Sequence, residues 1–127
     1  MPLVRISFIK GKPPGFGKRV GTIVYQAMRD TINVPEHDHF QVISEHEAHE
    51  LIYDRTYLGI SRTDSIVVIQ ITLNEGRTPE LKKALYQAIA DRLHTSLDIR
   101  REDVFISLVE VKKENWSFGN GLAQNAP

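Results

Sequence analysis

Apolar and polar residues alternate along the first ten positions of the chain. Val4, Ile6 and Phe8 project to one side of an extended backbone. The intervening side chains project to the other side, and they are Leu3, Arg5, Ser7 and Ile9. A period of two is typical of a strand, so the pattern predicts a strand over residues 3–9.

The period changes in the next segment. The stretch KPPGFG (12–17) contains two prolines and two glycines, which interrupt regular structure. Beyond it the apolar residues recur at helical spacing, at Val20, Ile23, Val24, Ala27, Met28 and Ile32. The predicted helix ends before Pro35, because the residue that precedes a proline avoids helical backbone angles. FQVIS (40–44) then predicts a short second strand.

The same order of elements returns in the second half. IVVIQITL (66–73) is apolar at nearly every position, which is typical of a central buried strand. Thr78 and Pro79 form a helix start, an N-cap followed by proline at the first helical position. The second helical stripe comprises Leu81, Ala84, Leu85, Ala88, Ile89 and Leu93. VFISLVEV (104–111) predicts the last strand.

The two halves match residue by residue, which indicates a duplication. The first strands and the VPEHDHF and IRREDVF segments align at an offset of 65, whereas VYQAM and LYQAI in the helices align at 61. We therefore predict an α+β fold in which a duplicated β-α-β unit forms a four-stranded mixed sheet with two helices on one face. The single domain spans 1–127, with repeats at about 2–47 and 66–112.

The other sheet face is expected to be apolar as well. The side chains assigned to it are Ile66, Val68, Ile106 and Leu108. Two helices on one side leave this face uncovered, so we expect subunit association to cover it in a closed symmetric oligomer.

Composition narrows the function classes. In 127 residues, sixteen basic side chains balance sixteen acidic ones, so no overall field favours nucleic acid or a membrane surface. Cysteine is absent, and no apolar run reaches the roughly 20 residues of a membrane helix. His46 and His49 are three apart, whereas the zinc-protease helix spaces its histidines by four, so we expect no metal. A cytoplasmic location is expected.

Proline directly follows the initiator methionine, and that position has chemical consequences. A small second residue favours removal of Met1, after which Pro2 would carry a free secondary amine in place of an amide. Proline is also unexceptional at the start of a strand, because its missing N–H costs little there. The position of Pro2 alone therefore does not distinguish a catalytic proline from a structural one.

Further motifs point to a family. The Pro-initiated strand, the duplicated β-α-β units and NEGRTPELKKALYQAIADRL (74–93) resemble the tautomerase superfamily, in which an amino-terminal proline is catalytic. VPEHDHFQ (34–41) and NWSFGNGLAQ (115–124) resemble segments of its malonate semialdehyde decarboxylase branch. The resemblance implies a homotrimer with active sites near subunit boundaries, no metal or organic cofactor, and a small-molecule 2-oxo or 3-oxo acid substrate.

The resemblance assigns roles to residues of this chain. Pro2 would be the general acid/base, since an apolar pocket and a nearby arginine lower the pKa of an amine towards 7. Arg77 would bind a substrate carboxylate through its planar fork. Asn74 stands where the decarboxylase branch has a second arginine. Asp38 either activates water or caps backbone amides, as its repeat mate Asp103 would.

An aromatic wall and three functional hypotheses complete the sequence-based picture. Trp116 and Phe118 either form an apolar wall of the site or serve as ordinary packing. We predict a keto-enol isomerase that acts on a small 2-oxo acid such as phenylpyruvate. The alternatives are a malonate semialdehyde decarboxylase or hydratase-type lyase, and a non-catalytic ferredoxin-like ligand-binding module.

Overall fold

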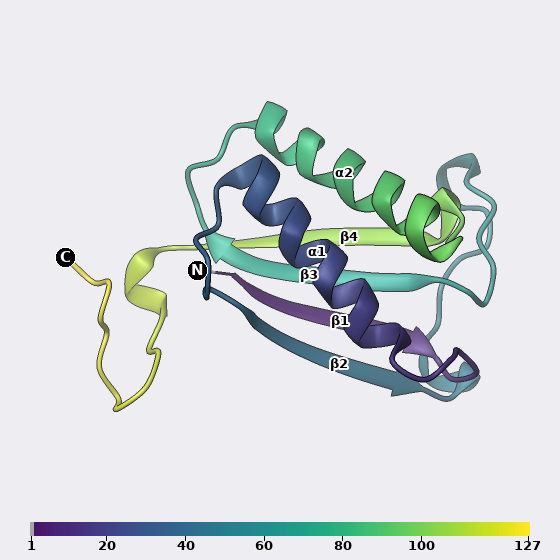
Figure 1. The fold of residues 1–127 in the computed structure, drawn as a ribbon, viewed down its shortest axis with the longest axis horizontal. Helices are drawn as coiled ribbons and strands as arrows, with labels where there is room; N and C mark the ends of the chain where they lie inside the picture. Colours follow the sequence, from purple (N-terminus) through teal and green to yellow (C-terminus); the bar gives the residue numbers. More distant parts are fainter. Residues whose placement is uncertain (1) are drawn as a thin grey trace.

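A four-stranded sheet with two helices on one face forms the fold in the computed structural model, which describes residues 2–127. Figure 1 shows both helices in front of the sheet. The elements are β1 (Leu3–Ile9), α1 (Phe16–Ile32), β2 (Phe40–His46), β3 (Val67–Asn74), α2 (Pro79–Leu97) and β4 (Val104–Val111). The strand order is β2-β1-β3-β4, so the first strand of each repeat lies in the centre.

Strand directions give the sheet two different ends. β1 runs parallel to β2, β3 runs parallel to β4, and the two central strands are antiparallel. At the end that we call the Pro2 end, β1 and β2 begin and β3 and β4 finish; the carboxyl terminus lies there (Figure 1). At the opposite end, called the Val67 end, β3 and β4 begin and α1 starts.

The core lies between the sheet and the helices. Strands β1 and β3 contribute alternate residues to it, as the period of two predicts. These are Val4, Ile6, Phe8, Val67, Ile69, Ile71 and Leu73, each at most 2% exposed. Helix α1 approaches β2 closely, because a Cβ added at Gly17 would lie 2.4 Å from Cγ2 of Ile43.

Hydrogen bonds repeat at a constant offset of 65 residues. The Val34 amide donates to the Met28 carbonyl after α1, and Ile99 donates to Leu93 after α2. The same offset relates the bonds Lys10 to His46 and Glu75 to Val111. The helices therefore align at 65 like the strands. The offset of 61 expected from VYQAM and LYQAI is wrong by about one helical turn, because a heptad-like stripe matches itself almost as well after four residues.

Two residues assigned to the uncovered sheet face lie on the other side. Ile106 and Leu108 pair with Ile69 and Ile71 of β3, and they pack against the core below the helices. The uncovered face of β4 instead presents Phe105 (48% exposed) and Val109. An apolar strand of this kind offers hydrophobic side chains to both faces, so the sequence alone did not distinguish them.

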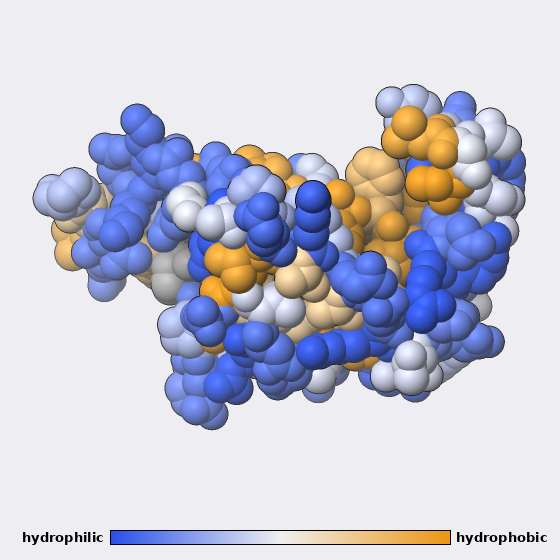
Figure 2. Space-filling view, turned by 90° about the horizontal axis from the view of Figure 1, so that it is seen from above, coloured by the Kyte–Doolittle hydropathy of each residue, from blue (hydrophilic) through white to orange (hydrophobic). Residues whose placement is uncertain are grey.

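The segment between β2 and β3 covers part of that face at the Val67 end. Ile52, Tyr57, Ile66, Val68 and Phe105 are among the residues that line a hollow of 260 Å³. Figure 2 shows hydrophobic atoms gathered beside this projecting segment. Neither helix in residues 2–127 has the length and apolarity needed to cross a membrane.

Candidate active site

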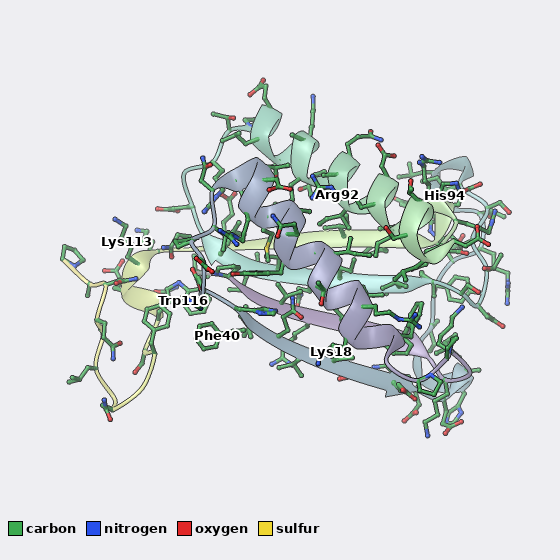
Figure 3. The ribbon with its side chains drawn as sticks, in the orientation of Figure 1. Lys18, Phe40, Arg92, His94, Lys113 and Trp116 are labelled. Carbon is green, nitrogen blue, oxygen red and sulfur yellow. The ribbon has the colours of Figure 1, made fainter. Side chains whose placement is uncertain are left out.

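Pro2 lies at the floor of a small apolar cavity at the Pro2 end. It is a buried residue, and it lines a cavity of 240 Å³ with Leu3, Phe40, Trp116, Ser117 and Phe118. Leu3 pairs with Phe40 because β2 begins beside the start of β1. Figure 3 shows Phe40 and Trp116 close to one another at this end. Met1, whose removal the sequence analysis expects, lies outside the described residues.

The aromatic residues near the carboxyl terminus form one wall of this cavity. After β4 the chain turns back, and the rings of Trp116 and Phe118 stack with centroids 5.6 Å apart and planes at 16°. The side chain of Gln124 braces this segment: it accepts a hydrogen bond from the Phe118 amide at 3.0 Å and donates one to the Gly119 carbonyl at 2.9 Å. The two rings thus lie side by side in the lining of the cavity.

Asn74 joins the aromatic wall to the end of β3. The indole Nε1 of Trp116 donates a hydrogen bond to Oδ1 of Asn74 at 2.8 Å. Because the amide oxygen faces the indole, the amide nitrogen of Asn74 faces elsewhere and is available as a donor. Asn74 is therefore held in one orientation by a residue 42 positions away.

Arg77 lies next to Asn74 in the turn before α2. Its Nη1 donates to the Asn74 carbonyl at 3.1 Å, and its Nη2 reaches the Ile32 carbonyl at 3.5 Å. A guanidinium has five N–H donors, so these two contacts fix the group and leave further donors for an anion. Arg77 does not line the 240 Å³ cavity itself, but it reaches the same end of the sheet through Asn74.

Glu110 of β4 is an acid that interacts with this turn. The Lys82 ammonium lies 2.7 Å from the Glu110 carboxylate and lowers the pKa of Glu110. The Gly76 amide and the Arg77 charge lower it further. Glu110 thus remains charged near neutral pH and is neutralised mainly by Lys82, rather than by Arg77.

Asp38 and its repeat mate Asp103 occupy equivalent turns. Each amide donates to the carbonyl three residues earlier, Asp38 to Pro35 and Asp103 to Arg100. The Asp103 carboxylate accepts hydrogen bonds from the amide and hydroxyl of Thr63 at 2.7 and 2.6 Å, so Asp103 anchors a loop. Asp38 is 6% exposed, and it precedes Phe40 of the cavity by two residues.

Part of the cavity was not expected from the sequence. Phe40 and Ser117 were not selected, although Phe40 stands in the VPEHDHFQ segment and Ser117 stands between the two selected aromatic residues. The selected residues meet at one end of the sheet, where Pro2, Trp116 and Phe118 line the cavity. Asn74 is hydrogen-bonded to Trp116, and Arg77 is hydrogen-bonded to Asn74. No group of three or more His, Asp or Glu side chains among residues 2–127 is arranged to hold a metal ion.

The chain is similar to known proteins over nearly its whole length. It is 47% identical to the probable tautomerase YusQ of Bacillus subtilis (strain 168), with 98% of each chain covered. It is 33% identical to the probable tautomerase YrdN of the same organism over 98% of this chain and 95% of that one.

Solved structures show the same fold. FG41 malonate semialdehyde decarboxylase, inhibited by 3-bromopropiolate, superposes with a TM-score of 0.89 at 30% identity, covering 96% of this chain and 92% of that chain. A fused 4-OT that forms a symmetric trimer superposes with a TM-score of 0.78 at 23% identity, covering 97% of each chain. The second similarity concerns the fold alone.

A family model described as "Tautomerase enzyme" matches residues 38–119. This match covers the second β-α-β unit and the Trp116–Phe118 wall, and the relatives extend the similarity to the strand that carries Pro2. The family match, the fold of the solved structures and the burial of Pro2 are consistent with one another. The chain belongs to the tautomerase enzyme family.

Proposed function

We propose that the protein is a cofactor-independent tautomerase that interconverts keto and enol forms of a small 2-oxo acid, with the amine of Pro2 as general acid/base. The burial of Pro2 in a cavity lined by Phe40, Trp116 and Phe118 is the observation that carries this proposal. The membership of the tautomerase family supports it.

The surroundings of Pro2 suit the chemistry of a base. After removal of Met1, the nitrogen would be a secondary amine in mainly apolar surroundings, which disfavour its cation and lower its pKa. A neutral amine of this kind can take the proton from C3 of a 2-oxo acid, and the electron pair then moves onto the C2 oxygen. The resulting ammonium returns the proton to that oxygen, which gives the enol and regenerates Pro2.

Two polar residues suit the anionic part of the substrate. Arg77 is fixed by two carbonyls and offers its other N–H groups to a carboxylate. Asn74, oriented by Trp116, offers an amide donor to a carbonyl or carboxylate oxygen. Asp38 stands at the same end and would assist in positioning the substrate or a water molecule.

The aromatic wall favours an aryl substrate. The rings of Trp116 and Phe118 stack on each other and line the cavity together with Pro2, so the cavity offers aromatic surface to an apolar substituent. A phenyl ring stacked there gains both apolar burial and aromatic contact. Phenylpyruvate is the 2-oxo acid that we propose as substrate.

Decarboxylation of malonate semialdehyde is the second candidate. The similarity to FG41 malonate semialdehyde decarboxylase favours it. Asn74 counts against it, because an amide supplies no positive charge where the decarboxylase branch is expected to carry a second arginine. Weaker electrostatic stabilisation of a dianion favours the tautomerase reaction.

We also propose that the active form is a homotrimer. The face of the sheet away from the helices exposes Phe40 (52%) and Phe105, and the neighbouring segment exposes Ile52 (91%). An exposed apolar patch on one face of a sheet marks an interaction site, which a second and third copy of the chain would cover. Sedimentation equilibrium of the untagged protein tests this, and a monomer at micromolar concentration contradicts it.

A product-resolved assay tests the function. Untagged protein is offered the enol of phenylpyruvate and, separately, malonate semialdehyde, and the products are followed by proton NMR. We expect keto phenylpyruvate from the first and no acetaldehyde from the second. Acetaldehyde as the faster product establishes the lyase, and the absence of any product establishes the non-catalytic module.

A further inference from the structure

A second cavity lies at the Val67 end. It has a volume of 600 Å³ and is lined by the turn before α1, the last turn of α2 and the segment that follows α2. Its side chains include Lys12, Phe16, Arg19, Ser65 and Arg100. The function proposed above does not use it.

The repeat relates one cation of this cavity, Lys12, to Arg77 at the Pro2 end. At the offset of 65 seen in the hydrogen bonds, Lys12 corresponds to Arg77 and Val67 corresponds to Pro2. Gly11 and Gly76, the residues that precede these two cations, both have a positive φ, of 115° and 121°. Lys12 and Arg77 therefore follow the same local turn of the backbone at opposite ends of the sheet.

The cavity has an excess of positive charge. Among the described residues, no ion pair involves Lys12 or Arg19, whereas Arg100 is paired with Glu102 and Asp103. The Lys12 ammonium donates to the Ser65 hydroxyl at 2.9 Å and lies 5.5 Å from the centre of the Phe16 ring. Asp98 is the acid that lines the cavity, so two unpaired cations face one carboxylate.

The start of α1 adds to this field. Gly15 makes no side-chain cap bond, and the first turn of α1 contains no acidic residue. By contrast, Thr78 caps α2, and Glu80 stands in its first turn. The Phe16 amide donates to the Pro13 carbonyl at 3.1 Å, but no side-chain carboxylate offsets the partial positive charge of this helix start beside Lys12 and Arg19.

We propose that this cavity binds a small organic carboxylate. Lys12 and Arg19 would hold the carboxylate, and Phe16, Leu97 and Ile99 would contact its apolar part. The inference rests on the cavity and its charges, and it stands whether or not Pro2 is catalytic.

A titration with benzoate tests the inference. Proton–nitrogen NMR spectra of the full chain are recorded with increasing benzoate, in an Arg77→Gln background that weakens binding at the Pro2 end. We expect saturable shifts at the amides of Lys12, Ser65 and Asp98 in the millimolar range. Inorganic phosphate, which lacks an apolar part, is expected to bind at least fivefold more weakly.

Three variants locate the ligand. Lys12→Gln and Arg19→Gln are each expected to weaken benzoate binding about tenfold, since each removes a charge-assisted hydrogen bond. Lys18→Gln removes a neighbouring charge on α1 outside the cavity and is expected to leave binding unchanged; thermal unfolding checks the fold of all three. Absence of saturable shifts at this end, equal weakening by all three variants, or phosphate binding as tight as benzoate each overturns the proposal.

Discussion

The two ends of the sheet are built from the same backbone pattern but carry different chemistry. At the Pro2 end a buried proline and a stacked aromatic wall line a cavity of 240 Å³, and Arg77 is held outside that cavity at the same end of the sheet. The Val67 end has a larger cavity of 600 Å³ with unpaired cations and no chain terminus. Duplication thus preserved the turns, whereas the position of the terminus decided which end can present an amine.

The largest expected effect comes from replacing Pro2, and it is compared with the replacement of a proline at the Val67 end. Pro2→Ala replaces the secondary amine and alters its placement, so kcat/KM for phenylpyruvate should fall by about 100-fold, the lower range for loss of a positioned acid/base. Pro14→Ala, an exposed proline at the Val67 end, is the matched control and should retain activity. Equal activity of the two variants contradicts the proline mechanism.

The next prediction compares the equivalent aspartates Asp103 and Asp38, which lie at the two ends of the sheet. Asp103→Asn places an amide donor against the donors of Thr63, so the free energy of unfolding should fall by about 2–3 kcal/mol in urea titrations. The folded fraction should keep its kcat/KM.

Asp38→Asn is the matched change at the Pro2 end. We expect it to lower kcat/KM about tenfold, because a charge beside the site is removed. Loss of stability without loss of kcat/KM, as in Asp103→Asn, would show that Asp38 has only the structural role of its repeat mate.

The arginine of the Pro2 end should affect substrate binding. Arg77→Met removes a charge-assisted clamp worth about 1.5–3 kcal/mol, so KM for phenylpyruvate should rise at least tenfold. Arg101→Met, which removes a charge paired with Asp91 near the other end, serves as the control. An unaltered KM and kcat in Arg77→Met removes Arg77 from the site.

The smallest expected effect concerns the aromatic wall formed by Trp116 and Phe118. Trp116→Phe retains an aromatic ring but loses the bond to Asn74, a contribution of about 1 kcal/mol, so kcat/KM should fall about fivefold. Tyr53→Phe loses one hydrogen bond to Asp64 at the Val67 end and should leave kcat/KM unchanged. A Trp116→Phe enzyme with full activity shows that Asn74 needs no orientation by the indole.

The elements were predictable because their periods are clear, and the errors have a physical cause. The alternation over β1 and the Thr78–Pro79 helix start were confirmed. The predicted alignment of α1 with α2 was wrong because a helical stripe tolerates a shift of one turn. The predicted sheet face of Ile106 and Leu108 was wrong because an apolar strand has two hydrophobic faces.

The sequence selected several residues that meet at the candidate site, but it did not predict the hydrogen bonds that connect them. The motifs selected Pro2, Trp116 and Phe118, which meet around one cavity. The bond from Trp116 to Asn74 and the anchoring of Thr63 by Asp103 join residues 42 and 40 positions apart. Such contacts depend on the path of the tail and of the segment after β2, which no local pattern specifies.

Covalent labelling tests most directly whether Pro2 carries a reactive amine. The reagent 2-oxo-3-pentynoate has an alkyne conjugated with its ketone, and such an alkyne accepts conjugate addition by a neutral amine. We predict that one equivalent adds to the nitrogen of Pro2, located by peptide mass spectrometry, in step with loss of phenylpyruvate tautomerase activity. Protein that retains Met1 should neither react there nor turn over substrate. Inactivation with the label elsewhere, or full activity in chains that retain Met1, contradicts the account.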